Sequence, residues 1–411
     1  MNTSTHTLNA GKNRMRVLVI GGGFAGGMAA VRLAGRSRGR ADITVVNPRP
    51  TLVHRLRMHQ VAAGQTIAAP DLRTILGPRV SLLQGYATGL DPQAGQVTVA
   101  TDDGERRVGF DRVVLATGSV TEPAPGPGGD HVHAVGDLGS ARRLRAAFAS
   151  LHPGAQVAVV GGGFTGLETV TELAAARPDV RVRLITSGEV GGWFTPAGAE
   201  HVRNRLRRLG VETVGEARAR AVEPGRVLLD DGAEVPADLT VWCGGFTAPP
   251  LARQAGLAVD EHGAALTDAA LQSVSHPHVM AVGDAGHAPG PRDQRHSMCC
   301  PFAFSSGAHA ADLLGQEALG RRSGEPAPFD MGYLGRCVAL GPGDAVLQLT
   351  TREDVATGTP WTGRATAGYK EFVLKGIGRT VWTARYAPGL VRWPRGARTS
   401  RSDAAARTVA A

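Results

Sequence analysis

The chain has 411 residues, of which 42% are hydrophobic and 20% charged, and a formal net charge of +9. This composition excludes an intrinsically disordered protein, and the lack of an apolar run approaching ~18 residues excludes an integral membrane protein. The length predicts two or three domains. Four cysteines are too few for a disulfide-stabilised scaffold of this length, which indicates a cytoplasmic protein.

The two ends of the chain differ from its body. Residues 1–14 are polar and lack the apolar core of a signal peptide, so we expect them to be disordered. Residues 361–411 hold ten basic and two acidic residues, which leaves residues 1–360 at a net charge of only +1. Because the basic charge is not spread over the body and no nucleic-acid recognition motif accompanies it, we expect no nucleic-acid partner.

One pattern occurs twice, 140 residues apart. Strand-like Met15–Ile20 precedes the turn GGGFAG and a helix-like stretch, and strand-like Gln156–Val160 precedes GGGFTG and another. In each copy a second apolar run, a hairpin turn with the sequence Asp-Asp-Gly and a third apolar run follow. The sequence therefore predicts two copies of a βαβ dinucleotide-binding module, each with a β-meander insert.

Each glycine-rich turn has the spacing that a pyrophosphate requires. The first glycine of the pattern permits a tight turn, the second lets the backbone approach the phosphates, and the third lets the helix pack on the strand. An acidic residue that binds the ribose is expected about 20 residues further on, but Asn47 stands there in copy one and Thr186-Ser187 in copy two. Without that carboxylate the choice between NADH and NADPH stays open.

Seven segments spread along most of the chain together resemble one known group of proteins. They are GGGFAG, HRLRMHQVAAG (54–64), APDLRTIL (69–76), FDRVVLATGS (110–119), GGGFTGLE (161–168), VWCGGFTAPPL (241–251) and VMAVGDAGH (279–287). Across roughly residues 15–350 the sequence resembles the flavoproteins with two dinucleotide-binding domains, and among them the type II NADH dehydrogenases. The resemblance implies an α/β fold in which two Rossmann-like domains, for FAD and NAD(P)H, precede a small C-terminal α+β segment.

The resemblance also implies domain limits and cofactor-binding residues. The FAD domain comprises 15–125 and 265–325, the NAD(P)H domain 126–264, and the C-terminal domain with its basic tail 326–411. The residues expected to bind FAD are Gly21, Gly23, Phe24, Ala25, Gly26, Asn47, Ala87, Thr117, Gly118, Gly283 and Asp284. Those expected to bind NAD(P)H are Gly161, Gly163, Phe164, Thr165, Gly166, Thr186 and Gly245.

Two further positions are candidates for catalysis. Glu168 matches a family glutamate near the nicotinamide ribose; the alternative is an exposed carboxylate in the first turn of a helix. His59 belongs to a cluster with His54, Arg55 and Arg57 that the resemblance places near the flavin ring. A cation there would stabilise an anionic reduced flavin, and the alternative is a solvated loop.

The cysteines bear on the electron acceptor. Residues 47–70 contain no cysteine and copy two contains only Cys243, which excludes the family's disulfide reductases. Cys299 and Cys300 lie between the Gly283-Asp284 motif and the following helix. The resemblance implies that this place faces the flavin. They are either redox-active thiols or small packing residues. An Ala-Gln quinone motif is usual at this place, but the sequence is SMCCPFAF.

The basic tail contains an imperfect amphipathic helix over Tyr369–Tyr386 and three of the five tryptophans. This combination favours peripheral contact with an anionic membrane surface on the cytoplasmic side, and the alternative is a solvated tail that packs on the body. The predicted activity is hydride transfer from NAD(P)H to FAD and then electron transfer to a quinone or similar small acceptor. A soluble reductase of an organic metabolite and a flavin-bound redox sensor remain alternatives. A homodimer stays open, and no metal is expected.

Overall fold

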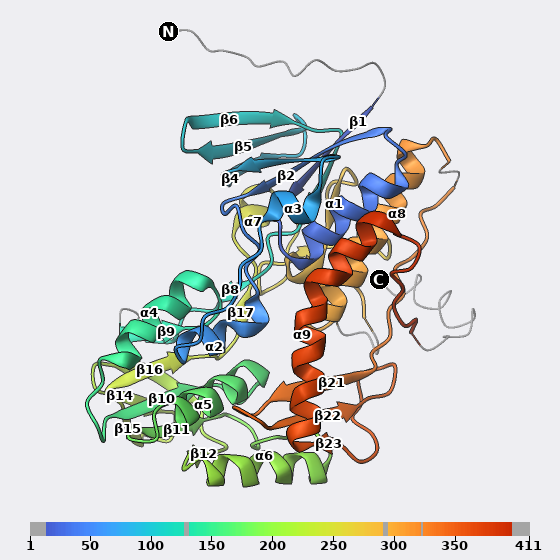
Figure 1. Ribbon diagram of the computed structural model, residues 1–411. Helices are drawn as coiled ribbons and strands as arrows, with labels where there is room; N and C mark the ends of the chain where they lie inside the picture. The colour runs from blue at the N-terminus through green and yellow to red at the C-terminus, as the bar shows by residue number, and fades with distance from the viewer. Residues whose placement is uncertain (1–13, 127–130, 291–294, 322–323, 397–411) are drawn as a thin grey trace.

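The computed structural model describes residues 14–126, 131–290, 295–321 and 324–396. Of the segment predicted to be disordered, residues 1–13 lie outside these ranges, as do residues 397–411 of the basic tail. Two parallel five-stranded sheets form the two halves of the molecule, and a C-terminal segment lies along both (Figure 1). The predicted α/β fold with two Rossmann-like units is confirmed.

The first sheet belongs to the N-terminal half. Its strand order is β19 (Val279–Ala281), β7 (Arg112–Leu115), β1 (Met15–Ile20), β2 (Ala41–Asn47) and β3 (Val80–Gln84). Side chains of β1 alternate: Val17 and Val19 pack with helices α1 (Phe24–Arg36) and α8 (Cys300–Ala318), whereas Leu18 and Ile20 pack toward the meander β4–β5–β6. Both faces of the sheet are covered, which explains the unbroken apolar strand. The meander strands are β4 (Tyr86–Asp91), β5 (Gln96–Thr101) and β6 (Gly104–Gly109).

The second sheet repeats this plan. Its strand order is β12 (Glu212–Val214), β11 (Arg181–Ile185), β10 (Gln156–Val160), β16 (Leu239–Trp242) and β9 (Val132–Ala134). Val157 and Val159 face a helical layer, and Ala158 and Val160 face the second meander. The helices are α4 (Leu138–Ala149), α5 (Phe164–Ala176) and α6 (Pro196–Arg208), and the meander strands are β13 (Ala219–Glu223), β14 (Arg226–Leu229) and β15 (Glu234–Pro236).

Short elements complete the first half, and some of them connect it to the second. Strand β8 (Val120–Thr121) pairs with β17 (Phe246–Thr247), and β18 (Ala265–Leu266) with β20 (Gly286–His287). The short helices are α2 (Met58–Ala62), α3 (Leu72–Leu76) and α7 (Leu251–Gln254), and two 3-10 turns cover Arg55–Arg57 and Gly283–Ala285. Helix α2 packs on α4 and α5 of the second half, so the segment that follows the first sheet reaches the second.

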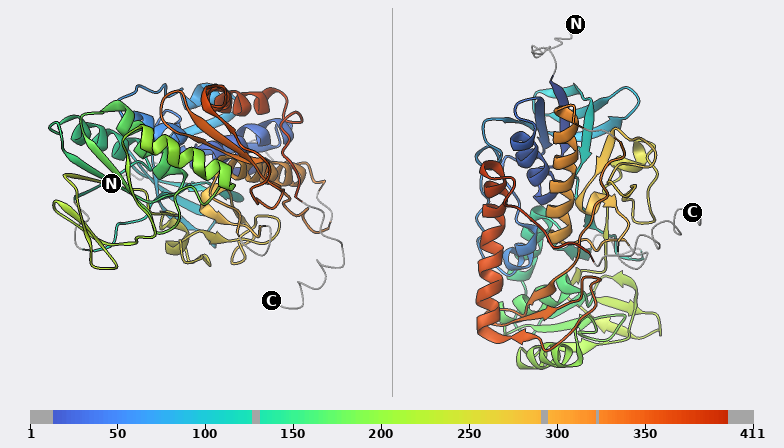
Figure 2. Two further views of the ribbon diagram at one scale, coloured as in Figure 1. Left: turned by 90° about the horizontal axis from the view of Figure 1, so that it is seen from below. Right: turned by 90° about the vertical axis from the view of Figure 1, so that its right-hand side faces the viewer.

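The C-terminal segment forms a small sheet and one long helix. Its strands are β21 (Gly335–Ala339), β22 (Ala345–Leu349) and β23 (Trp361–Thr362), and its helix is α9 (Gly363–Tyr386). Helix α9 runs along the side of the molecule from β23 to α1 and α3 (Figures 1 and 2). The sequence placed its start at residue 369, and the helix begins six residues earlier. None of the helices in the described ranges is long and apolar enough to span a bilayer.

A buried arginine ties α1 to the end of the chain. Arg32 is 4% exposed, and its guanidinium donates to both carboxylate oxygens of Asp312 on α8, at 2.8 Å each. It also donates to the carbonyl oxygens of Pro388 and Val391, which follow α9. The same helix that starts at the first glycine-rich turn therefore holds the segment after α9.

Candidate functional site

The first glycine-rich turn has a distinct steric reason for each glycine. Gly21 has φ +106°, and a Cβ there would lie 2.3 Å from the carbonyl oxygen of Ala116. A Cβ on Gly26 would lie 1.9 Å from the oxygen of Gly21, whereas one on Gly23 would meet nothing within 4 Å. The turn and the helix contact thus exclude side chains, and the space above Gly23 is open for a ligand at the start of α1.

The second turn has the same construction. Gly161 has φ +119° and its Cβ would lie 2.5 Å from the oxygen of Cys243, while that of Gly166 would lie 1.8 Å from the oxygen of Gly161. Again a Cβ on the middle glycine, Gly163, meets nothing within 4 Å. The turns at the N-termini of α1 and α5 are therefore equivalent, and each leaves space that suits a phosphate group.

A cavity opens in front of the first turn. Asp284 lines it, and its Oδ2 accepts a hydrogen bond of 2.6 Å from Ser119 Oγ. Gly283 beside it has φ +59° and donates its N–H to Ser306 Oγ at 2.9 Å. The predicted residues that line this cavity are Gly21, Gly23, Phe24, Ala25, Asn47, Thr117, Gly118, Gly283 and Asp284.

Two predicted residues do not line the cavity, and several lining residues were missed. Gly26 packs behind the turn and Ala87 lies in the meander strand β4. Ser119 and Asp137 are additional lining residues. Asp137 caps α4, and its Oδ1 accepts from the N–H of Gly139 at 2.7 Å. Only Ser119, which directly follows the quoted Ala-Thr-Gly, carries a signal that sequence could have supplied.

Arg55 provides a test of whether this cavity suits a dinucleotide. Its guanidinium lies 3.2 Å from the position of a Cβ on Gly118 and lines the cavity. Burial lowers the pKa of Arg55, with the charges of Asp284 and Asp137 opposing the shift. Within the part of the chain that the structure describes, the Arg55 guanidinium makes no hydrogen bond or ion pair, and the backbone N–H of Arg55 donates to the oxygen of Val53. A partly buried cation without a partner fits an anionic group such as the pyrophosphate of FAD.

The ribose positions are built without carboxylates. Asn47 Oδ1 accepts from the N–H of Gly22 at 2.8 Å, and its amide donates to the oxygen of Arg49 at 2.7 Å. In the second half, the Thr186 hydroxyl lies 2.1 Å from the position of a Cβ on Gly162. Both side chains therefore support their own turn, and neither brings a negative charge that would repel a 2′-phosphate. Gly245, also predicted, has φ +151° at the end of the neighbouring strand.

Glu168 lies in a buried ionic cluster. Its carboxylate accepts from Lys370 Nζ of α9 and, at 3.1 Å, from the N–H of Ala339 of β21. His59 Nδ1 of α2 lies 3.5 Å away, and Lys370 also donates to the oxygen of Cys337 at 2.8 Å. The alternative of an exposed carboxylate is wrong, because α5 begins at Phe164 and turns residue 168 inward.

The charges in this cluster follow from burial. Burial would raise the pKa of Glu168, but the ammonium of Lys370, then His59 and the hydrogen bonds from Lys370 and Ala339, lower it below its ordinary value. Burial lowers the pKa of His59 to about 4, although Glu168 opposes the shift. The cluster at neutral pH thus consists of a carboxylate, an ammonium and a neutral imidazole whose Nε2 has no partner among the described residues.

The cluster around His59 divides into separate roles. Of its four members only Arg55 lines the cavity. Arg57 pairs with Glu371 of α9 at 2.6 Å, and His54 Nε2 lies 3.0 Å from the oxygen of Leu374. His59 faces Glu168 and is uncharged at neutral pH, so it does not supply the cation expected beside the flavin ring.

Cys300 is the first residue of α8, and Cys299 directly precedes it; the sequence predicts a helix over residues 306–314, so α8 begins six residues earlier than expected. Burial raises the pKa of both thiols, that of Cys300 to about 11 despite the charge of Lys370. Both are therefore protonated at neutral pH, although Cys300 is the first residue of a helix. This favours packing over nucleophilic chemistry.

The matching family model covers residues 15–307 and describes pyridine nucleotide-disulphide oxidoreductases. A NADH dehydrogenase-like protein of Mycobacterium tuberculosis is 32% identical over 336 residues, which are 75% of this chain and 83% of that protein. The demethylphylloquinone reductase NdbB of Synechocystis is 26% identical over 81% of this chain and 86% of its own. NDH2 from Plasmodium falciparum, solved in complex with NADH, shares the fold with a TM-score of 0.74 at 13% identity, covering 93% and 99% of the two chains.

The two glycine-rich turns, the cavity with its unpaired arginine and these matches agree. The chain belongs to the pyridine nucleotide-disulphide oxidoreductase family and is an FAD-dependent NAD(P)H dehydrogenase.

Proposed function

We propose that this enzyme passes the electrons of NAD(P)H to a quinone at an anionic membrane surface, on its cytoplasmic side. Two relatives support the acceptor by name, the demethylphylloquinone reductase and a type II NADH:quinone oxidoreductase of M. tuberculosis. The domain limits and site residues given above are part of the proposal.

The two faces of α9 carry this proposal. On the inner face Lys370 reaches Glu168, and Leu374, Ile377 and Val381 are buried. The outer face leaves large apolar side chains uncovered: Tyr369, Phe372, Val373, Trp382 and Tyr386, of which Phe372 is 70% exposed. A helix that joins an apolar surface to a buried ionic cluster suits an acceptor that arrives from lipid.

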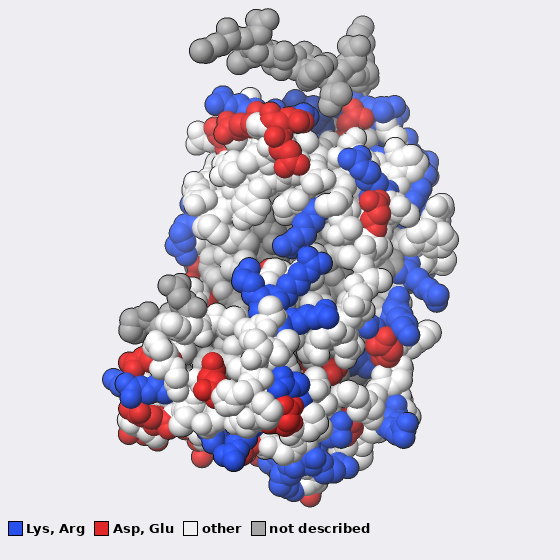
Figure 3. Space-filling view, turned by 60° about the vertical axis from the view of Figure 1, so that its left-hand side comes forward, with Lys and Arg blue, Asp and Glu red and all other residues white. Residues whose placement is uncertain are grey.

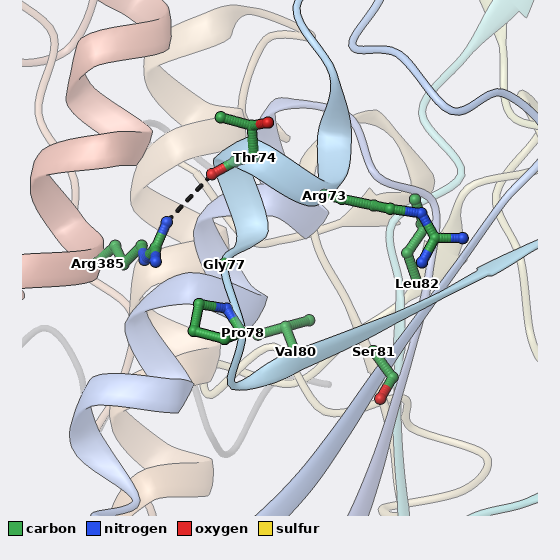
Figure 4. Close-up of a pocket in the computed structure, with 8 residues that line it drawn as sticks. All are labelled: Arg73, Thr74, Gly77, Pro78, Val80, Ser81, Leu82 and Arg385. Atoms are coloured by element: carbon green, nitrogen blue, oxygen red, sulfur yellow. Dashed lines mark hydrogen bonds between the residues drawn. The ribbon is translucent and has the colours of Figure 1, made fainter.

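Basic side chains accompany the apolar face. Lys375 and Arg379 are exposed on α9, and Arg385 lies 5.0 Å from the ring centroid of Tyr386. Arg385 also donates to the oxygen of Thr74 at 3.1 Å across a shallow hollow between α9 and α3 (Figure 4). Arg73 lines the other side of this hollow, which suits a lipid phosphate. In a view turned by 60° from Figure 1, Lys and Arg side chains gather near the middle of the molecule (Figure 3).

The chain's own residues supply binding, orientation and protons. FAD, when bound, carries the two electrons between NAD(P)H and the acceptor. Lys370 of α9 and Glu168 of α5 form a buried ion pair on the inner face of α9, and quinone reduction consumes two protons. We assign the Lys370–Glu168 pair to proton delivery to the quinone.

Vesicle binding and quinone reduction test the proposal together. Phe372 and Trp382 are both exposed, so Phe372→Gln/Trp382→Gln should fold and keep its flavin. Burying two such side chains contributes roughly 3 kcal/mol, so vesicle affinity should fall about 100-fold. Activity with a long-chain quinone in anionic vesicles should fall with it, while activity with a soluble dye stays constant.

Tyr86→Gln is the matched control, since Tyr86 is an exposed aromatic on β4. It should change neither vesicle binding nor quinone activity. Equal vesicle binding of the α9 variant and the wild type would contradict the membrane contact. Failure of every quinone to reoxidise the reduced flavin would contradict a quinone as the electron acceptor. It would favour the alternatives of a soluble reductase of an organic metabolite or a flavin-bound redox sensor.

A further inference from the structure

Trp193 is a large, exposed aromatic side chain beside the second glycine-rich turn. It lies in the loop between β11 and α6, and 53% of its surface is exposed. Its ring packs edge-on against Phe164, with 6.1 Å between centroids and 68° between planes. Phe164 is the first residue of α5 and directly follows Gly163. The indole therefore lies next to the helix terminus that receives the dinucleotide phosphates.

The surrounding residues fix this indole in place. The guanidinium of Arg336 on β21 lies 5.9 Å from the indole centroid, and its Nη1 donates to the oxygen of Trp193 at 2.6 Å. Arg336 is itself held by Asp354 at 3.0 Å. On the other side of the loop, Phe194 is buried against Phe164. The position of Trp193 is thus set by two elements, although the described residues leave about half of its surface uncovered.

The place of Trp193 along the dinucleotide follows from its neighbours. Thr186, at the carboxyl end of β11, marks the adenosine ribose. Strand β21, which holds Arg336, continues to Cys337 and Ala339, the residues that contact Lys370 and Glu168. Trp193 accordingly lies on the side of the turn away from adenosine and toward the buried ionic cluster.

We propose that Trp193 covers the nicotinamide half of bound NAD(P)H, with Arg336 as the residue that positions it. A fixed aromatic ring offers contact area with little loss of side-chain entropy on binding. The inference concerns the nucleotide and is independent of the acceptor, so it holds or fails separately from the quinone proposal.

Tryptophan fluorescence of the oxidised holoenzyme provides a direct readout, because a nicotinamide ring in contact with an indole quenches its emission. NAD⁺ should quench the wild type, and ADP-ribose, which lacks the nicotinamide, should quench it much less. Trp193→Phe should lose most of the NAD⁺ quenching. Trp361→Phe is the matched control, since Trp361 is similarly exposed but lies on β23, and it should behave as the wild type.

Binding and kinetics give the second readout. Trp193→Ala should raise the KM for NAD(P)H about tenfold, or about 1.4 kcal/mol, and leave the limiting rate of flavin reduction within about twofold. Trp193→Phe, which keeps an aromatic ring, should restore most of the affinity. Undiminished NAD⁺ quenching in Trp193→Phe would overturn the proposal, as would an unchanged KM in a correctly folded, flavinated Trp193→Ala. Equal quenching by ADP-ribose would place the contact on the adenosine half and overturn it too.

Discussion

Replacing Lys370 by methionine removes the only ammonium that contacts Glu168 among the described residues. The side chains are 11% and 12% exposed, so the carboxylate is left buried with the N–H of Ala339 and the neutral His59. Breaking a buried ion pair by removing one partner costs roughly 3–5 kcal/mol. Because one backbone hydrogen bond remains, we expect about 3 kcal/mol for Lys370→Met.

The assay combines stability with the two half-reactions. A loss of about 3 kcal/mol should lower the Tm of the flavin-saturated protein by roughly 5 °C. Glu168→Gln/Lys370→Met leaves no charge uncompensated and should lose less than the two single variants together, with a coupling of about 2 kcal/mol. In stopped-flow experiments, flavin reduction by NAD(P)H should stay within about twofold, whereas reoxidation by quinone should slow on the order of 100-fold.

Two results would refute this reasoning. An unchanged Tm for Lys370→Met would mean that water reaches Glu168 and replaces the ammonium. Strict additivity in the double variant would mean that the two side chains do not interact. A slowed flavin reduction with normal reoxidation would place the pair in the first half-reaction and overturn its assignment to proton delivery.

Three further predictions follow from the geometry. Burial lowers the pKa of His59 to about 4 from an ordinary 6.5, so on acidification the unfolded chain binds a proton before the folded one does. The free energy of unfolding should therefore fall by about 3 kcal/mol as the pH is lowered from 6.5 to 4. His59→Gln should remove this dependence from unfolding curves measured over that pH range, and an unaltered slope would show that other groups cause it. Gly166→Ala places a methyl group against the backbone of the second turn and should weaken NAD(P)H binding more than tenfold by titration without loss of flavin; wild-type affinity would refute the steric argument. Arg32→Met should cost about 3 kcal/mol in unfolding experiments and make residues 387–396 sensitive to limited proteolysis, and a resistant segment would show that α9 alone holds it.

The sequence predicted those parts of the site that depend on local chemistry. Each glycine-rich turn can be predicted from its own residues. At Gly21 and Gly161 a φ near +110° and a distance under 2.6 Å from a Cβ position to a neighbouring carbonyl oxygen exclude any other residue. The strands follow from apolar runs that are buried on both faces. Even the true start of α8 had a signal, since Pro301 stands in the first turn, where its missing N–H costs nothing.

Contacts between distant parts of the chain were beyond the sequence. Lys370 lies 202 residues from Glu168, and no pattern in α9 distinguishes it from the exposed Lys375. Arg55 and Arg57 stand two positions apart, yet one lines the cavity and the other pairs with Glu371. The packing of α2 and α9 decides which way each of these side chains points. The hydrophobic periodicity of a short segment does not predict that packing.

The contacts of Arg32 have a consequence for how the protein is made. The helix that starts at the first glycine-rich turn is among the first segments to leave the ribosome, but Asp312, Pro388 and Val391 come near the end of synthesis. Until then the guanidinium of Arg32 has none of these partners, and α1 lacks α8 on its flank. The N-terminal half cannot complete its core during translation as an independent unit. The sheet of the second half lies within residues 132–242, but its core also takes Val338, Leu340 and Val346 from the C-terminal segment. Flavin would accordingly be taken up after release of the chain, when the C-terminal segment has completed both cores.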